Sequence, residues 1–479
     1  MTSESRATAA VIEFVTQSKI DHFSREAVAL GKQCIADGLG VILAGSTAQG
    51  SRIIREYIRT GEEAPEATVL GAEVFRCRAA SAALANGTAG HALDFDDTQL
   101  SSTPDRIFGL LTHPTIPPLV ASLALGERLA VSGRRLLEAY LVGFEVECKM
   151  AEAIDPSHYK NGFHSSGTFG TFGALVAAAK LLQLDAGSIA NALAIAASMS
   201  AGIRLNFGTM TKPLHVGRAA QNGVMAAELA ARGFTGGGEP LDGTWGFFKV
   251  FSFGAGFDAN RLVGALGNPP SIVTPGVSLK PYPCGSLGHP SMDAMLKLVL
   301  AHDVKPHDVR AIRLRAGSNI LNPLRYAIAH SELEAKFCPA FMLSSIVLRR
   351  KAGIHEFVDE FVKSSPVQDM MKKASTVRDP AIEALGFDKM RSIVEVDLTD
   401  GRTLAQEADE RYRGGPERPF TREELRGKFA ECADLVLPAE AIDETFALVE
   451  SLERVPDVRD LIRVMTAGVP ARQLGASYR

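Results

Sequence analysis

A histidine, three carboxylates and a hydroxyl fall within eight consecutive residues of this chain, in the segment ANGTAGHALDFDDT at residues 85–98. An imidazole beside carboxylates can accept and return a proton, and a hydroxyl can donate a hydrogen bond to a small ligand. If the segment is one helix, His91, Asp94 and Thr98 share a face and Asp96 lies on the opposite side. The alternative is a helix end that runs into a polar loop with solvated aspartates. The first interpretation predicts a face that exchanges protons with one small ligand.

Further polar residues stand in segments marked by glycine or proline, where binding and catalytic side chains are often found. These residues are His113, His164, Lys212, Lys280, Cys284, His289 and Lys336. Each also has a plainer interpretation. A histidine before a proline is often a loop residue bonded to the backbone, a lysine before a proline is often solvated, and a lone cysteine is usually a buried thiol. Only a tertiary structure that gathers these distant segments would make them one site.

The elements that must position these residues are mostly helical. Apolar residues recur with helical spacing from about residue 8 to residue 265, with short glycine and proline breaks, and again from residue 421 to residue 465. Between these stretches the apolar and polar residues alternate as in β-strands, with a hairpin-like turn before the last strand. The strand-like segments are residues 309–316, 392–398 and 403–408. The pattern therefore predicts a mainly α protein with a smaller α+β insertion.

The length of 479 residues exceeds the size at which one hydrophobic core usually stops growing, so at least two domains are expected. We predict a large all-helical domain built from both chain ends, residues 1–266 and 411–479. A smaller α+β domain at residues 267–410 interrupts it.

Composition excludes several classes of function. The net charge of −4 argues against a nucleic-acid-binding surface, which needs clustered positive charge. The six cysteines form no CxxC pair and no ligand spacing for a metal, which is typical of free thiols in a reducing compartment. The chain has no signal-like start and no run of 18 apolar residues. We therefore expect a cytoplasmic protein that binds neither nucleic acid nor membranes.

The polar segments resemble the motifs of the MmgE/PrpD family, in order and spacing, over almost the whole chain. The matching residues are ANGTAGHALDFDDT at 85–98, THP at 112–114, GFHSSGTFG at 162–170, TKPLHVGRAAQNG at 211–223, KPYPCGSLGHP at 280–290 and EAKF at 334–337. The family includes 2-methylcitrate dehydratase, cis-aconitate decarboxylase and an iminodisuccinate epimerase. The resemblance implies a large helical domain, a smaller α+β lid domain, a homodimer, and activity without a metal or organic cofactor.

Carried over motif by motif, the resemblance implies a pocket between the domains. The catalytic residues would be Asp94, His113, His164 and Lys212, and the substrate-binding residues would be Thr98, Lys280 and His289. Two positions depart from the decarboxylase branch of the family. Gly285 stands where that branch has a histidine, and Phe341 stands where it has a tyrosine. Decarboxylation is therefore disfavoured, unless His289 supplies the missing imidazole from a shifted position.

The chemistry shared by the family is removal of a proton from a carbon beside a carboxylate. Lys212 and Lys280 would hold substrate carboxylates and oppose the negative charge that develops. His113 or His164 would exchange the proton, because the ordinary imidazole pKa lies near neutrality. Asp94 would orient an imidazole or act as the base, and Thr98 would donate a hydrogen bond.

The sequence thus predicts a cofactor-independent lyase that dehydrates a 2-hydroxy di- or tricarboxylate of the 2-methylcitrate kind. The alternatives are an isomerase or epimerase, or a decarboxylase, acting on a related di- or tricarboxylate. A non-catalytic binding protein on the same scaffold is a third alternative. The intact set of polar residues argues against it.

Overall fold

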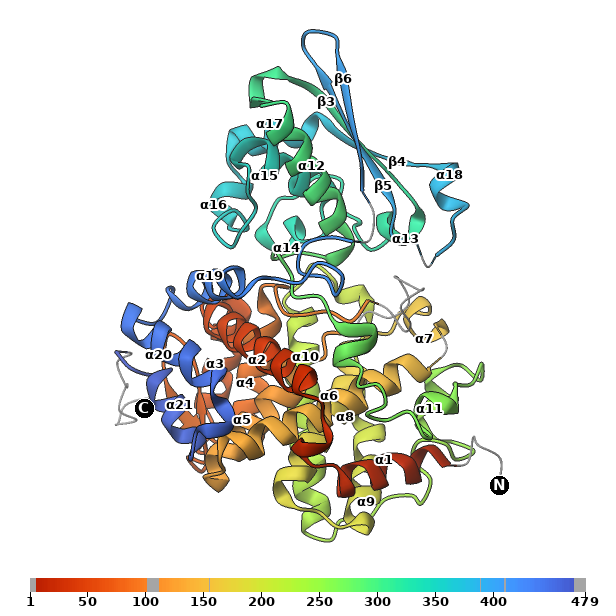
Figure 1. Ribbon diagram of the computed structural model, residues 1–479, viewed down its shortest axis with the longest axis vertical. Helices are drawn as coiled ribbons and strands as arrows, with labels where there is room; N and C mark the ends of the chain where they lie inside the picture. The colour runs from red at the N-terminus through yellow and green to blue at the C-terminus, as the bar shows by residue number, and fades with distance from the viewer. Residues whose placement is uncertain (1–5, 101–111, 155, 388, 409–410, 469–479) are drawn as a thin grey trace.

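The computed structural model describes residues 6–100, 112–154, 156–387, 389–408 and 411–468, which form two parts stacked on one another (Figure 1). Helices make up most of the larger part, and the two sheets are small. The predicted mainly α fold is confirmed.

The larger part is a bundle centred on α10, which packs against α4 and α8. Helix α8 also packs against α5 and α6, and α4 packs against α5. These helices are α4 (Ala79–Ala92), α5 (Ile116–Leu129), α6 (Gly133–Ala153), α8 (Ser165–Leu182) and α10 (Thr211–Ala231). Glycines allow the close contact between them. A Cβ atom at Gly87 would lie 2.8 Å from the Cα atom of Gly217, and one at Gly170 would lie 2.7 Å from Cγ of Pro117. The small residues of this region therefore serve helix packing.

Both ends of the described chain belong to the larger part, as the red and blue ribbons show (Figure 1). The remaining elements of this part are α1 (Ala7–Gln17), α2 (Arg25–Gly45), α3 (Gln49–Arg59), β1 (Ala67–Val69), β2 (Phe75–Cys77), α7 (Ser157–Lys160), α9 (Ala186–Met199), α11 (Phe247–Phe251), α19 (Arg422–Ala433), α20 (Ala439–Glu450) and α21 (Val458–Val464). Helices α19 and α20 pack on α2, and α21 packs on α5. The antiparallel pair β1–β2 was not predicted.

Helix α2 is long and apolar enough to cross a membrane by length and composition alone, with a mean hydropathy of 1.5. However, 72% of that stretch is buried inside the protein. Asp37 in this helix is 2% exposed, and its Oδ1 lies 2.7 Å from Nζ of Lys428 in α19. Lys428 also donates a hydrogen bond to the carbonyl oxygen of Phe95 at 2.8 Å. Extensive burial and a buried ion pair are features of a core helix. The contacts of Lys428 also connect α19 to the segment that follows α4.

The smaller part is a four-stranded sheet in the order β4-β3-β5-β6, with helices α12, α15 and α17 on one side (Figure 1). Its elements are α12 (His289–Ala301), β3 (Val309–Ala316), α13 (Ser318–Leu321), α14 (Glu332–Ala335), α15 (Pro339–Arg349), α16 (Asp359–Val362), α17 (Ser365–Lys372), β4 (Ala374–Arg378), α18 (Pro380–Glu383), β5 (Ser392–Leu398) and β6 (Thr403–Ala408). Strand β3 runs antiparallel to β5 and parallel to β4. The bounds of β3, β5 and β6 agree with the predicted strands. The sequence did not predict β4, an exposed edge strand without apolar alternation.

The two parts have separate hydrophobic cores. Leu279 packs in the core of the larger part, whereas Tyr282 and Tyr412 pack in the core of the smaller part. Leu425 belongs to the first core again. The core changes near residue 280, thirteen residues beyond the predicted start at 267, and the division of the chain into folding units stays a prediction.

Candidate active site

A cavity lies between the two parts of the protein. Its lining from the larger part is Asp94, Thr98, His113, Tyr159, His164, Phe207 and Lys212. Its lining from the connection to the smaller part, and from that part itself, is Lys280, Gly285, Ser286, Leu287, Pro323, Leu324 and Phe337. The structure therefore brings together every predicted site residue except His289.

The segment at residues 85–98 is not one continuous helix. Helix α4 ends at Ala92, and Asp94 has a φ of +53°, in the left-handed region that aspartate adopts more readily than most residues. Its N–H donates to the carbonyl oxygen of His91 at 3.2 Å. The chain then extends, and Thr98 pairs antiparallel with Ser278. The prediction of a shared helical face is wrong, because tertiary contacts of the polar side chains stabilise a turn instead.

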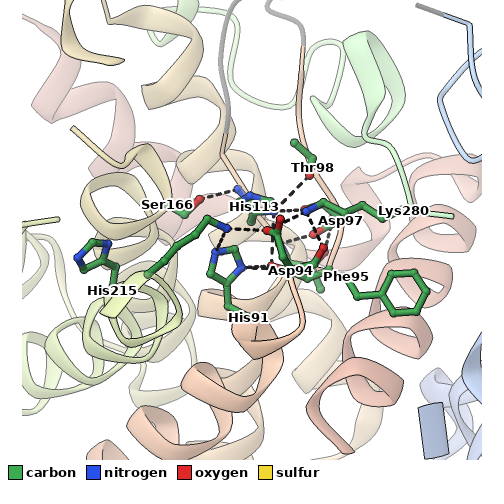
Figure 2. A network of polar contacts seen from close by, with 12 residues as sticks. His91, Asp94, Phe95, Asp97, Thr98, His113, Ser166, His215 and Lys280 are labelled. Carbon is green, nitrogen blue, oxygen red and sulfur yellow. Dashed lines mark hydrogen bonds and ion pairs between the residues drawn. The ribbon is translucent and has the colours of Figure 1, made fainter. Parts of the chain in front are cut away.

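Asp94 lies between two lysines, of which Figure 2 labels Lys280. Its Oδ1 accepts hydrogen bonds from Nζ of Lys212 at 2.6 Å and from Nζ of Lys280 at 3.0 Å. Its Oδ2 is buried and has no hydrogen-bond partner within the described ranges. Burial alone raises the pKa of Asp94, but the two ammonium groups outweigh it and hold the pKa well below its usual range. Asp94 thus holds two positive charges together, and in the described part of the chain its carboxylate has no hydrogen bond to an imidazole.

His91 and Asp96, which the sequence did not assign to the site, form a chain of polar contacts that ends at Lys212. Nδ1 of His91 lies 2.8 Å from Oδ2 of Asp96, and its Nε2 lies 2.8 Å from Nζ of Lys212. Because an ammonium group can only donate, Nε2 accepts and the ring proton is on Nδ1, facing Asp96. In a continuous helix, Asp96 would lie on the side opposite His91, so this contact was not predicted. The spacing H-x-x-D-x-D would have revealed this contact once a turn was placed after Ala92.

His113 is held by its neighbours so that one ring nitrogen remains a proton acceptor. Its Nδ1 lies 2.8 Å from the carbonyl oxygen of Asp97 and 3.2 Å from Oγ1 of Thr98. A carbonyl oxygen only accepts, so Nδ1 carries the proton and Nε2 has a free lone pair. The backbone N–H of His113 donates to Oγ of Ser166 at 2.9 Å (Figure 2). The carboxylate of Asp97 accepts from Oγ1 of Thr115 at 2.7 Å, which holds the segment around His113 in place.

His164 immediately precedes α8 and lies deep in the cavity wall, with 1% of its surface exposed. Its Nδ1 lies 3.0 Å from Nδ1 of His215, and its buried Nε2 has no partner among the residues that the structure describes. Burial, and then the charge of Lys212, lower the pKa of His164 well below its ordinary value. Burial likewise lowers the pKa of His113. Both imidazoles are therefore neutral at pH 7 and suited to accept a proton.

The lowered imidazole pKa values predict that the protein stays active below the usual titration range of histidine. A protonated imidazole cannot act as a base, and burial shifts that protonation to lower pH. In the profile of kcat/KM against pH, which reports the free protein, the acid limb should lie below pH 6.5. Initial rates in constant-ionic-strength buffers would measure it. A limb at or above pH 6.5 would contradict this description of the two histidines.

Three imidazoles in this site could be considered as metal ligands. His91, His113 and His164 each offer a ring nitrogen, and these atoms lie within 4.8 Å of one another. However, Nε2 of His91 already accepts a hydrogen bond from the ammonium group of Lys212, and this positive charge would repel a divalent cation there. The donor set fits proton exchange and anion binding better than a metal ion.

His289 does not reach the cavity, so the expectation that it supplies an imidazole there is not met. Its Nε2 donates to the carbonyl oxygen of Cys284 at 3.1 Å, and its ring contacts Tyr282 and Tyr412 edge-on. Burial lowers the pKa of His289 to about 3. As the first residue of α12, it turns into the core of the smaller part, where it serves packing.

A mainly helical body and an α+β part meet at a cavity whose lysines and neutral histidines suit anion binding and proton exchange. The MmgE/PrpD N-terminal domain matches residues 9–260, and the MmgE/PrpD C-terminal domain matches residues 282–454. The chain therefore belongs to the MmgE/PrpD family.

Several curated relatives are named cis-aconitate decarboxylase. The protein of Mus musculus is 28% identical over 459 residues, which cover 93% of this chain and 91% of the relative. The protein of Homo sapiens is 28% identical over 462 residues, with 94% and 93% covered. The protein of Aspergillus terreus is 23% identical over 489 residues, with 98% and 97% covered. The chain is thus similar to these relatives over nearly their full length.

Proposed function

We propose that this protein is a cofactor-independent lyase that removes water from a 2-hydroxy di- or tricarboxylate of the 2-methylcitrate kind. One observation supports this proposal above the others. A single cavity is lined by two ammonium groups, Lys212 and Lys280, and by two neutral imidazoles, His113 and His164. This combination binds a carboxylate and removes a proton from the carbon beside it.

The residues divide the work according to their charge. Lys212 and Lys280 hold a substrate carboxylate and stabilise the enediolate-like charge that develops when the neighbouring carbon loses its proton. Nε2 of His113 or of His164 accepts that proton, and an imidazolium returns a proton to the hydroxyl, which leaves as water. Thr98 contributes a hydroxyl to the same wall and orients His113.

An apolar wall supports a substrate with an alkyl substituent. Phe207, Leu324 and Phe337 line the cavity, and the rings of Phe207 and Phe337 stack with their centroids 5.6 Å apart. A methyl group buried against this wall gains about 0.8 kcal/mol, which is about fourfold in affinity. A methyl-substituted acid should therefore bind more tightly than its unsubstituted analogue.

Decarboxylation is the main alternative, because the relatives quoted above are named cis-aconitate decarboxylases. The surroundings of Gly285, which stands where the decarboxylase branch of the family has a histidine, argue against decarboxylation. A Cβ atom there would lie 2.9 Å from Cδ2 of Leu324 and 3.5 Å from Cδ1 of Phe337, so apolar side chains fill the space next to this position. An isomerase that removes and returns a proton uses the same groups and is the second alternative.

We further propose that the smaller part acts as a lid and that the protein is a homodimer, as the family resemblance implies. His164 and Lys280 are each 1% exposed, so a substrate enters only when the two parts separate. Exposed apolar side chains near α11, including Trp245 at 89%, support a face that a second copy covers. Light scattering coupled to gel filtration would give the mass in solution, and a monomer at micromolar concentration would rule out the dimer.

Proton NMR in D₂O tests the proposed reaction. The protein would be incubated, with a chelator present, with 2-methylcitrate, citrate, cis-aconitate or iminodisuccinate, and a Lys212→Met variant would serve as the inactive control. New olefinic signals from a 2-hydroxy acid are expected. A product formed from cis-aconitate with release of CO₂ would favour the decarboxylase, and deuterium incorporation without an alkene would favour the isomerase. No reaction with any acid would overturn the proposed substrate class.

A further inference from the structure

His215, a residue outside the predicted site, forms a pair with the most deeply buried histidine of the cavity. The two Nδ1 atoms lie 3.0 Å apart, and the ring centroids lie 5.2 Å apart. At this distance one Nδ1 donates and the other accepts, so the two rings share one proton between these atoms. The two rings therefore form a hydrogen-bonded chain. At its cavity end, Nε2 of His164 has no hydrogen-bond partner among the described residues.

The surrounding backbone makes room for this pair. Gly202 has a φ of +138°, and a Cβ atom there would lie 3.2 Å from Cγ of His215 and 3.4 Å from its Nδ1. A Cβ atom at Gly167 would lie 3.2 Å from Cβ of His215. The carbonyl oxygen of Gly202 also accepts the backbone N–H of His164 at 3.0 Å. The same turn thus holds one histidine and leaves space for the other.

The two histidines differ in their access to water. His164 is 1% exposed, and the charged or titratable groups that shift its pKa are Lys212, His91, His215 and His113. Three of these four groups are buried, whereas His215, the fifth residue of α10, is only partly buried. Within this set, His215 is the residue with the most exposure to solvent.

We propose that His215 relays protons between His164 and water. The inference rests on the proposed function, and of its two candidate bases it takes His164, rather than His113, as the group that removes the proton from a substrate carbon. The C–H bond breaks, an N–H bond forms at Nε2 of His164, and the electron pair stays on the substrate. The proton on Nδ1 of His164 then moves to Nδ1 of His215, and Nε2 of His215 releases a proton to water. A proton that enters by the reverse path and leaves Nε2 of His164 for the departing hydroxyl restores both tautomers.

Two substitutions of His215 separate a relay from a positioning role. His215→Gln keeps a hydrogen-bonding group beside His164 but cannot pass a proton on, and His215→Ala leaves a space that free imidazole can fill. A relay predicts that both variants lose kcat by roughly 10- to 100-fold with little change in KM, which is less than the loss of a direct acid–base group. Added imidazole should restore His215→Ala in proportion to its concentration. Wild-type turnover in His215→Gln, or no rescue, would overturn the relay.

A second measurement does not depend on turnover. In protein labelled with ¹⁵N-histidine, the exchange of the His164 ring proton with water should slow at least tenfold in His215→Gln. The control is His158→Gln, which removes a buried histidine bonded to Phe251 and Thr168 away from the cavity lining. Equal exchange in wild type and His215→Gln would overturn the relay even if the protein dehydrates its acid. Slowed exchange in a protein inactive on every acid would instead support the relay and reject the proposed function.

Discussion

Replacing His113 by alanine is expected to lower kcat roughly 10²- to 10⁴-fold, the usual contribution of a positioned acid–base group. Nδ1 of this ring is bonded to the carbonyl oxygen of Asp97, so its Nε2 is held as an acceptor at the cavity wall. Alanine removes the acceptor, whereas Lys212 and Lys280 still hold the substrate carboxylate, so KM should change little. Steady-state rates on the acid identified by NMR would measure both constants.

The matched control for this substitution is again His158→Gln, which should keep turnover near that of wild type, because His158 does not line the cavity. Thermal unfolding of each variant would show that His113→Ala is folded. His164→Ala should lose activity to a similar extent if it is the second proton-exchanging group. Near-full turnover in both histidine variants would show that the cavity imidazoles do not carry the reaction.

Replacing Lys428 by methionine is expected to lower the free energy of unfolding by about 3–5 kcal/mol at pH 8, because it leaves a buried carboxylate without its partner. Asp37 is 2% exposed and pairs with Lys428 at 2.7 Å, and Lys428 also holds the carbonyl oxygen of Phe95. Methionine fills similar space, so the loss reports the charge. Urea unfolding followed by circular dichroism would measure it.

The destabilisation in Lys428→Met should shrink as the pH falls. Burial already raises the pKa of Asp37 despite Lys428, and removing the lysine raises it further. A carboxyl whose pKa is raised in the folded state stabilises that state at low pH and loses this contribution as the pH rises. The difference from wild type should therefore be smaller at pH 5 than at pH 8. A difference that does not change with pH would contradict a charged Asp37.

A surface lysine provides the comparison for Lys428. Lys363, which directly follows α16, pairs with Asp359 at 2.6 Å, and the two side chains are 55% and 49% exposed. Lys363→Met should change the free energy of unfolding by about 0.3–0.5 kcal/mol, because water screens an exposed pair. An equal effect of Lys428→Met and Lys363→Met would show that burial of the Asp37 pair has no energetic consequence.

The regular parts of the fold were predictable because local patterns determine them. Alternation of apolar and polar residues marks β3, β5 and β6, and their predicted bounds agree with the structure. Strand β4 was missed because it pairs in parallel with β3 at an exposed edge, so no apolar alternation marks it. A local pattern predicts a strand when one face of that strand is buried and therefore apolar. The pattern is absent from an exposed strand such as β4, which forms because it pairs with a neighbouring strand.

By itself, the sequence determined the family, the mainly α fold, and six residues that line one cavity from widely separated segments. Only the tertiary structure decided what those residues contact. Asp94 bonds two lysines, Asp96 turns to His91, and His289 turns into a separate core. The reason is that a buried charge or imidazole must find partners, and those partners come from segments up to 186 residues away. Residue type and spacing reveal which polar side chains the chain can bring to a site. Which of them form hydrogen bonds is decided by the packing of α4 against α10 and by the position of Lys280.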